Sequence, residues 1–215
     1  MSKNLVIFGA GGFAREVAWN VGNINSVYPD TWNLVGFLEQ GNERIGQLLN
    51  GIPIIGVDDA RRYAPPLYAV VAIGDSRARE RVVCEAKALG CHFATLIHPS
   101  VQYDRGAVVF GHGAIICAGN ILTVNITVGA HVILNLDCTV GHDSIIEDYA
   151  TISPGCHLSG HTIVRRSVFL GTGAVTIPGV QVGAGAVVGA GAVVIRDVLD
   201  GIKVVGAPAM AKGTQ

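Results

Sequence analysis

A six-residue repeat runs through the second half of the chain and constrains its fold more than any other feature. Every sixth residue from Phe110 to Val194 is bulky and apolar, with Thr176 as the polar exception, and a small residue usually follows four positions later. The repeat positions are Phe110, Ile116, Leu122, Val128, Leu134, Val140, Ile146, Ile152, Leu158, Val164, Leu170, Thr176, Val182, Val188 and Val194. Such periodicity is typical of a parallel β-helix, in which three short strands form one coil of about 18 residues. The bulky residues are predicted to fill the interior of a prism, and the small ones to lie where the chain turns a corner.

The residue before each repeat position is often large and apolar as well. Side chains alternate along a strand, so these residues are predicted to point away from the prism interior. They include Ile115, Ile121, Ile133, Ile145, Ile163, Phe169, Val175, Val187 and Val193. Strand propensity explains part of this enrichment, but a solvent-facing row of this size exceeds the apolar patch typical of a monomer. We therefore expect the row to be buried in a homo-oligomer interface.

Residues 1–98 show a different pattern, in which apolar runs alternate with helical segments. Strands are expected at 4–8, 34–38 and 68–73, and helices at 13–24, 58–63 and 76–89. Strands that alternate with helices indicate a parallel sheet, and about 95 residues make half of a two-lobed dinucleotide fold. The change at His98-Pro99 divides the chain into an α/β half-Rossmann domain, 1–98, and an all-β domain, 99–215.

Charge, hydropathy and cysteine usage exclude several broad classes of protein. Fifteen basic residues against sixteen acidic ones give a net charge of −1, which argues against binding to nucleic acid or to an acidic membrane. The mean hydropathy is +0.46, yet no window of about 18 residues has the uninterrupted apolar character of a membrane-spanning helix. The first nine residues resemble a strand rather than a signal peptide. Five cysteines without a CxxC pair favour a reduced, cytoplasmic protein.

The repeat, together with Gly206-Ala207-Pro208-Ala209 near the C-terminus, resembles the left-handed β-helix acyltransferases. Residues 1–98 resemble the N-terminal half-Rossmann domain of one branch of that family. The branch contains nucleotide-linked amino-sugar N-acetyltransferases of bacterial surface-glycan synthesis and sialic-acid O-acetyltransferases. The resemblance implies a left-handed coil and a homotrimer that binds acetyl-CoA in the cleft between neighbouring prisms.

A glycine-rich turn follows the first expected strand. Residues 9–14 read Gly-Ala-Gly-Gly-Phe-Ala and open a helix, an arrangement whose backbone amides can approach a phosphate, although a plain tight turn is the alternative. Two more candidates, Glu39 and the 73–77 segment, lie where the second and third strands end, at the edge where such sheets bind ligands. The residues expected to bind the nucleotide sugar are Gly9, Gly11, Gly12, Phe13, Glu39, Gly74 and Arg77. Members of the family commonly carry His where Phe13 stands.

The pair His142-Asp143 matches the catalytic base of the family and its neighbouring carboxylate. Acetyl transfer requires removal of a proton from the attacking amine or hydroxyl, and the ordinary pKa of histidine suits this step. Asp143 would orient the imidazole and stabilise its cation. Neighbours on a straight strand point in opposite directions, so the pair can meet only if the chain turns a corner there. Glu147 is the alternative partner, and a surface histidine at a corner is the alternative to a catalytic one.

A column of residues spaced by 18 reads Cys117, Asn135, Ser153, Gly171 and Gly189. The loss of side chains along this column suggests a groove that admits an extended ligand. The resemblance places Asn135, Ser153 and Gly160 near the acetyl and thioester end of acetyl-CoA, with the Gly160 amide as oxyanion donor. It places Thr172, Gly173 and Ala190 along the pantetheine. Relatives often carry a second His where this chain has Thr151.

Five histidines lie within the repeat, but their spacings do not bring three imidazoles to one point in a single chain. The five are His112, His131, His142, His157 and His161. A carbonic-anhydrase type of zinc site needs three converging imidazoles. The sequence therefore predicts no metal site.

The resemblance, together with the His142-Asp143 pair, implies direct acetyl transfer from acetyl-CoA to a nucleotide-linked amino sugar, with His142 as general base. O-acetylation of a sialic acid or another sugar by the same residues is the nearest alternative. A trimeric scaffold that binds a nucleotide sugar without catalysis is an alternative of another class, against which the intact His142-Asp143 pair argues.

Overall fold

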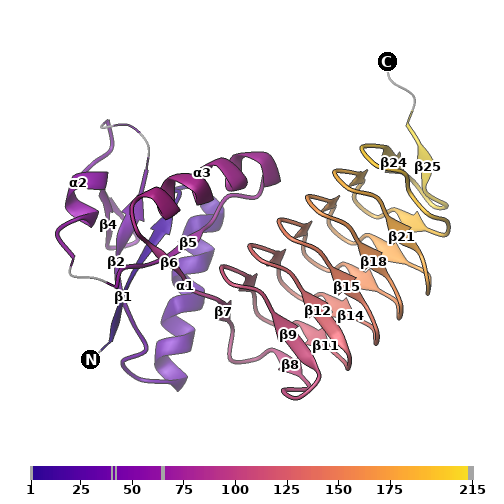
Figure 1. Cartoon of the computed structure of the whole chain (residues 1–215), viewed down its shortest axis with the longest axis horizontal. Coiled ribbons are helices and arrows are strands. Elements are labelled where there is room, and N and C mark those ends of the chain that lie inside the picture. The colour runs from indigo at the N-terminus through magenta and orange to yellow at the C-terminus, as the bar shows by residue number, and fades with distance from the viewer. Residues whose placement is uncertain (1, 40, 42, 64–65, 213–215) are drawn as a thin grey trace. The chain divides into compact units, whose positions relative to one another are not determined.

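The computed structural model describes residues 2–39, 41, 43–63 and 66–212. The chain forms two compact units, Met1–Pro99 and Ser100–Gln215 (Figure 1). The first unit mixes helices and strands, and the second is a stack of short strands. Within the described ranges, no helix is long and apolar enough to cross a membrane.

The first unit is built on a mainly parallel sheet with the strand order β3-β4-β2-β1-β5-β6. Its strands are β1 (Lys3–Phe8), β2 (Trp32–Leu38), β3 (Leu48–Leu49), β4 (Ile52–Ile55), β5 (Tyr68–Val71) and β6 (His92–Phe93), and its helices are α1 (Gly12–Val27), α2 (Val57–Ala60) and α3 (Ser76–Ala88). Because β1 pairs in parallel with β2 and with β5, the carboxyl ends of these three strands meet at one edge of the sheet. This confirms the predicted half-Rossmann architecture.

Local sequence explains where the helices of this unit begin and end. Helix α3 begins after Asp75, whose side chain accepts a hydrogen bond from the Ala78 amide at 2.7 Å, as a good N-cap residue does. Helix α2 is shorter than the expected 58–63 segment because its end tightens into a turn. The Arg62 and Tyr63 amides donate three residues back, at 3.1 and 3.2 Å, rather than four.

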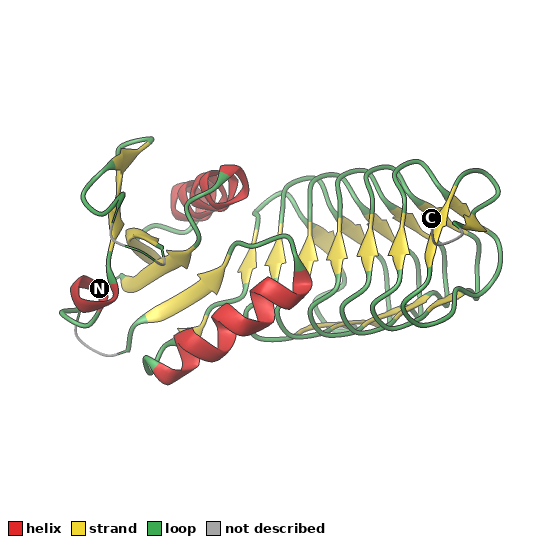
Figure 2. Cartoon of the chain, turned by 90° about the horizontal axis from the view of Figure 1, so that it is seen from above, coloured by secondary structure: helices red, strands yellow, loops and turns green. Residues whose placement is uncertain are grey.

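The second unit is a prism whose three faces are stacks of short strands, which Figure 2 shows from above. The first face contains β10 (Ile115–Ile116), β13 (Ile133–Leu134), β16 (Thr151–Ile152), β19 (Phe169–Leu170), β22 (Val187–Val188), β24 (Lys203–Val205) and β25 (Met210–Ala211). The second contains β8 (Gln102–Tyr103), β11 (Ile121–Leu122), β14 (Thr139–Val140), β17 (His157–Leu158), β20 (Val175–Thr176) and β23 (Val193–Val194). The third contains β9 (Val108–Phe110), β12 (Ile126–Val128), β15 (Ile145–Ile146), β18 (Ile163–Val164) and β21 (Gln181–Val182), and β7 (Leu96–Ile97) precedes the prism in sequence.

Successive coils pair in the register that the repeat predicts. Thr139 pairs with His157 and Ile145 with Ile163, in each case 18 residues apart and in parallel. The repeat positions fill the interior, and Thr176 is buried with them. Its hydroxyl accepts a hydrogen bond from the Ser159 amide at 3.1 Å and lies 3.0 Å from the Thr162 hydroxyl, so the one polar repeat position is satisfied. The predicted parallel β-helix is confirmed.

The outward apolar row is less exposed than the sequence suggested. Ile115 and Ile133 are 0% and 1% exposed, because other parts of the same chain cover them. Ile121, Ile145 and Phe169 remain about two-fifths exposed, at 41%, 41% and 39%. The prediction that the whole row faces outward to solvent or a partner is therefore wrong for Ile115 and Ile133.

Turns between the strands form the three edges of the prism, and two of these edges carry the predicted site residues. We call residues 124–125, 142–143, 160–161 and 178–179 the His142 edge, and residues 118–119, 136–137, 154–155, 172–173 and 190–191 the Thr172 edge. The second residue of these turns has a left-handed backbone, as at Asp143 (φ +59°) and His161 (φ +57°). A left-handed residue breaks the alternation of a strand, so neighbouring side chains can point to the same side.

Candidate active site

His142 and Asp143 meet at the turn that follows β14. His142 Nδ1 lies 2.8 Å from Asp143 Oδ2, and the left-handed backbone of Asp143 makes this contact possible between neighbours. One coil earlier on the same edge, Asn125 Nδ2 donates to the other carboxylate oxygen, Oδ1, at 3.1 Å. The carboxylate is thereby fixed on both oxygens and holds the imidazole in one orientation.

These contacts also set the electrostatics of the pair. The hydrogen bond from His142, followed by that from Asn125, lowers the pKa of the Asp143 carboxyl, so Asp143 is ionised at neutral pH. An ionised Asp143 favours the tautomer of His142 with its proton on Nδ1. The Nε2 lone pair is then available to accept a proton from a bound acceptor.

Gly160 lies against the ring of His142 and leaves no room for a side chain. A Cβ atom at this position would lie 2.6 Å from His142 Nε2 and 2.7 Å from Cε1. The Gly160 amide donates no hydrogen bond to any residue that the structure describes. A backbone N–H beside the imidazole is suited to bind a developing oxyanion.

Glu147 does not compete with Asp143 for His142. Arg165 Nη1 donates to Glu147 Oε1 at 2.6 Å, and the Arg166 amide donates to Oε2 at 2.9 Å. Both carboxylate oxygens are therefore engaged away from the His142 edge. Of the two carboxylates that the sequence offered, the structure brings Asp143 to the imidazole.

The residues expected to bind the coenzyme lie along the Thr172 edge, apart from Gly160, which lies on the His142 edge. Asn135 and Ser153 directly follow β13 and β16, where the chain enters the Thr172 edge, and Thr172, Gly173 and Ala190 lie on the edge itself. In the described part of the chain, the amides of Thr172 and Ala190 donate no hydrogen bond. Both residues are exposed, so these amides can bind the carbonyl oxygens of an extended ligand.

The glycines beside this edge have a packing role that the groove hypothesis did not include. A Cβ atom on Gly171 would lie 2.6 Å from the Ala190 amide nitrogen, and one on Gly189 would lie 2.7 Å from Val205 Cγ1. The missing side chains therefore allow successive coils to approach one another.

A cavity of about 270 Å³ lies at the carboxyl edge of the sheet in the first unit, and it contains part of the expected nucleotide site. Its lining residues are Phe8, Gly9, Leu38, Glu39, Ile73 and Val82. Gly9 has a φ of +105°, and a Cβ atom there would lie 3.3 Å from the Ala72 carbonyl oxygen, so the turn requires glycine. Gly11, Gly12, Gly74 and Arg77 are exposed and Phe13 is half-buried; none of these five lines the cavity.

Two arginines that the sequence analysis did not identify bind residues at the carboxyl edge of the sheet in the first unit. Arg44 Nε donates to Glu39 Oε2 at 2.8 Å, and its Nη2 bonds Oε1, so the Glu39 carboxylate is already paired. Arg79 is buried in α3, and its Nη1 donates to the carbonyl oxygens of Ile73 and Gly74 at 2.6 and 3.1 Å. Spacing could have identified Arg79, because it shares the buried face of α3 with Val83 and Ala86, four and seven residues later.

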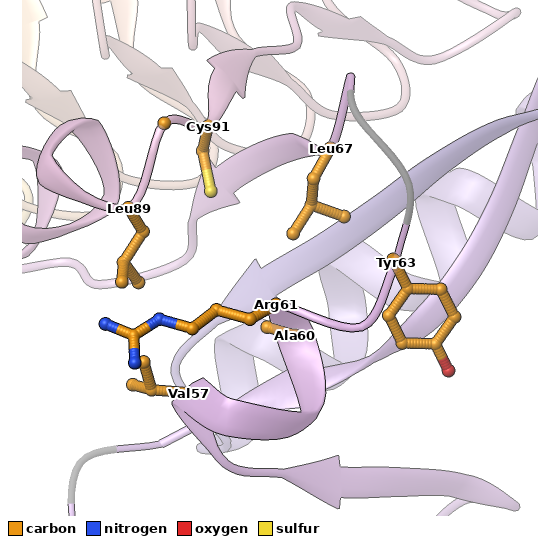
Figure 3. Close-up of a pocket in the computed structure, with 8 residues that line it drawn as sticks. Val57, Ala60, Arg61, Tyr63, Leu67, Leu89 and Cys91 are labelled. Carbon is orange, nitrogen blue, oxygen red and sulfur yellow. The ribbon is translucent and has the colours of Figure 1, made fainter.

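A second cavity of the first unit, of about 250 Å³, has no predicted site residue in its lining (Figure 3). Its walls are mostly apolar and are formed by Val57, Ala60, Arg61, Tyr63, Leu67, Leu89, Gly90 and Cys91. The Arg61 guanidinium pairs with Asp58 at 3.1 Å, and burial raises the pKa of the Cys91 thiol. A protonated thiol is a poor nucleophile, so this cavity does not offer the chemistry found at the His142 edge.

Known proteins resemble the chain along both units. The family described as the PglD N-terminal domain matches residues 4–86. Over 178 residues the chain is 34% identical to the GDP-perosamine N-acetyltransferase of Escherichia coli O157:H7, which covers 81% of this chain and 78% of that protein. PerB from Caulobacter crescentus, solved in complex with CoA and GDP-perosamine, is 31% identical with a TM-score of 0.85, covering 98% of this chain and 97% of that one. The acetyltransferase domain of PglB from Neisseria gonorrhoeae, solved with acetyl coenzyme A, is 31% identical with a TM-score of 0.87, covering 99% of this chain and all of that one.

Proposed function

Since the chain belongs to the left-handed β-helix acetyltransferases that carry a PglD-type N-terminal domain, we propose that it transfers the acetyl group of acetyl-CoA to a nucleotide-linked amino sugar. The observation that carries this proposal is the His142-Asp143 pair, joined at 2.8 Å, with the free Gly160 amide beside the imidazole. Base, orienting carboxylate and oxyanion donor are the three groups that direct acyl transfer needs.

The proposed reaction proceeds without an acyl-enzyme. The amine of the sugar attacks the thioester carbonyl, and the carbonyl oxygen gains negative charge next to the Gly160 amide. His142 Nε2 takes the proton that the amine loses, while the Asp143 carboxylate stabilises the resulting imidazolium. The C–S bond then breaks, and the proton passes to the departing CoA thiolate, so that an amide and CoA are the products.

The two substrates have separate places in this proposal. The nucleotide of the sugar binds at the carboxyl edge of the first unit, where the Gly9 turn and Glu39 line a cavity, with Gly11, Gly12, Phe13, Gly74 and Arg77 around it. Acetyl-CoA binds along the Thr172 edge through Asn135, Ser153, Thr172, Gly173 and Ala190. All five cysteines are free thiols, which supports a reaction in the reducing cytoplasm.

The positions of the two edges on the prism support a homotrimer. Within one chain the His142 edge and the Thr172 edge lie on opposite sides of the second face, separated by strands such as β14. A threefold arrangement brings the His142 edge of one copy to the Thr172 edge of the next, so that each complete site uses two copies. The second face is then turned toward the neighbouring copies.

This proposal is tested with matched pairs of nucleotide sugars that differ only in an amino or a hydroxyl group at the acceptor carbon. We expect CoA release with the amino compound, and a thermal-shift screen of GDP-, UDP-, dTDP- and CMP-sugars identifies the base to use. Turnover only with the hydroxyl compound, or with free sialic acid, would identify an O-acetyltransferase instead. Binding of a nucleotide sugar without any turnover would indicate a non-catalytic scaffold protein.

Replacement of Asp143 by asparagine is expected to lower kcat by about tenfold or more, because an amide cannot stabilise the imidazolium or fix its tautomer. Glu147→Gln is the matched control, since Glu147 binds Arg165 and the Arg166 amide and does not touch His142. Steady-state kcat of both variants is measured at saturating substrates. Equal losses in the two variants would remove Asp143 from its proposed role.

Ile121→Lys is expected to shift the protein from trimer to monomer at micromolar concentration and to lower activity in parallel. Ile121 is an exposed apolar residue of the second face, and burial of a lysine charge in an interface is costly. Val109→Lys, an equally apolar exposed position on the third face, is the control and should leave the mass unchanged. Light scattering that finds a wild-type monomer would refute the shared site.

A further inference from the structure

A second imidazole lies on the His142 edge, and the proposed reaction gives it no role. His161 follows His142 by one coil, and its ring packs edge-on against that of His142, with 5.0 Å between centroids and 89° between planes. His161 Nε2 lies 3.6 Å from Asp143 Oδ2, the same oxygen that His142 Nδ1 approaches to 2.8 Å. One carboxylate oxygen therefore lies between two imidazole nitrogens.

This arrangement has the dimensions of a metal site. One donor atom from each of His142, Asp143 and His161 lies within 4.8 Å of the other two. Tetrahedral zinc with bonds of about 2.0–2.1 Å separates neighbouring donor atoms by roughly 3.4 Å. The observed separations of 2.8 and 3.6 Å lie on either side of that value, and no pair of these donor residues exceeds 4.8 Å between its ligand atoms.

The surroundings of the cluster support a bound ion. Asn125 Nδ2 donates to Asp143 Oδ1 and leaves Oδ2 for the ion, an outer-shell contact of the kind that orients metal-ligating carboxylates. The side chains of His142, Asp143 and His161 are 56%, 38% and 63% exposed, so water can complete the coordination. Because Gly160 has no side chain, the His142 ring is not crowded from that position.

The donor set selects the class of ion. Two imidazoles and one carboxylate suit zinc, cobalt, nickel and copper, whereas magnesium and calcium prefer oxygen ligands alone. The spacing of the histidines predicts no metal site because three imidazoles do not converge, whereas the structure brings the Asp143 carboxylate to two imidazoles as a third donor.

We propose that His142, Asp143 and His161 form a binding site for a divalent transition-metal ion that inhibits acetyl transfer. An ion bound to His142 Nδ1 replaces the proton there, and the ring keeps its single proton on Nε2. Nε2 then has no lone pair with which to accept a proton from the acceptor amine. The binding of the ion stands on the geometry alone, whereas its inhibitory effect rests on the proposed function.

The binding is tested on the full chain, stripped with a chelator and titrated with cobalt, whose visible absorption reports imidazole and carboxylate coordination. We expect one cobalt ion per protomer in the wild type. His161→Gln should weaken binding by at least about tenfold, because loss of even an outer-shell contact costs about 10–100-fold. His157→Gln removes another exposed imidazole, which lies on the second face 3.0 Å from the Thr139 hydroxyl, and should leave cobalt binding unchanged.

Equal cobalt affinity in the wild type and His161→Gln, or no cobalt spectrum in the wild type, would overturn the site. Inhibition is measured with zinc by chromatography of the acetylated sugar, because the CoA thiol itself binds zinc. We expect His161→Gln to keep its turnover in the absence of metal and to need at least about tenfold more zinc for half inhibition. Full wild-type activity at zinc concentrations that saturate the site would overturn the inhibitory role. Because the cobalt spectrum requires no acceptor sugar, it reports on the metal site even if the proposed reaction fails.

Discussion

Replacement of His142 by glutamine is expected to lower kcat by about 10²- to 10⁴-fold, the contribution typical of a general base. Glutamine has a similar polarity but accepts no proton near neutral pH. The KM for acetyl-CoA should change little, because the residues proposed to bind the coenzyme lie mainly on the Thr172 edge. The measurement is steady-state release of CoA with the amino sugar that the screen identifies.

The fold should survive this substitution, since the His142 side chain is 56% exposed and fills no interior position. The control is a thermal unfolding curve that matches the wild type. His161→Gln provides a second comparison at the same edge, because it removes an imidazole with a similar exposure but no proposed role in proton transfer. A His142→Gln variant with nearly full activity would exclude His142 as the base.

Gly160→Ala is expected to lower kcat by about 10²-fold, the loss that a misplacement of about 1 Å at a reacting centre can cause. The added Cβ atom would lie 2.6 Å from His142 Nε2, so either the imidazole or the backbone of the next coil must move. Both shifts damage the site, because the imidazole is the proposed base and the Gly160 amide is the proposed oxyanion donor. The effect should appear in kcat at saturating acetyl-CoA.

Gly22→Ala provides the matched control for this substitution. Gly22 lies within α1, and a Cβ atom there meets no other atom within 4 Å. Alanine also favours a helix over glycine, so this variant should keep full activity and equal or greater stability. A wild-type kcat in Gly160→Ala would contradict this prediction, because the site would then tolerate a Cβ atom at a position 2.6 Å from His142 Nε2.

The sequence predicts the fold well because its repeat is governed by a simple rule of packing. Each interior position must be filled, and a shift of one residue would expose it, so the register of residues such as Leu134 and Ile152 can be counted along the chain. The one irregular position, Thr176, needed the structure, because its partners Ser159 and Thr162 lie 17 and 14 residues away.

The candidate site is only partly predictable from the sequence, because it also depends on contacts between residues far apart in the chain. From the sequence, His142 and Asp143 can meet only if the chain turns a corner between them. The structure shows that corner in the left-handed backbone of Asp143. Pairings between coils decide the rest: Glu147 binds Arg165 from the next coil, and His161 reaches Asp143 across 18 residues. Such contacts depend on side-chain direction at the turns, which an apolar repeat does not specify.

The last strands of the prism affect solubility, because the final coil of a β-helix has no following coil to pair with. Each coil offers its backbone N–H and C=O groups to the next, so an uncovered final coil would be a template for other chains and for fibre growth. In β25 the chain reverses direction and pairs antiparallel with β24, through Val204 with Ala211 and Val205 with Met210. A strand of the opposite direction interrupts the parallel series on the first face of the prism, and there it makes the last edge a poorer template for another parallel coil.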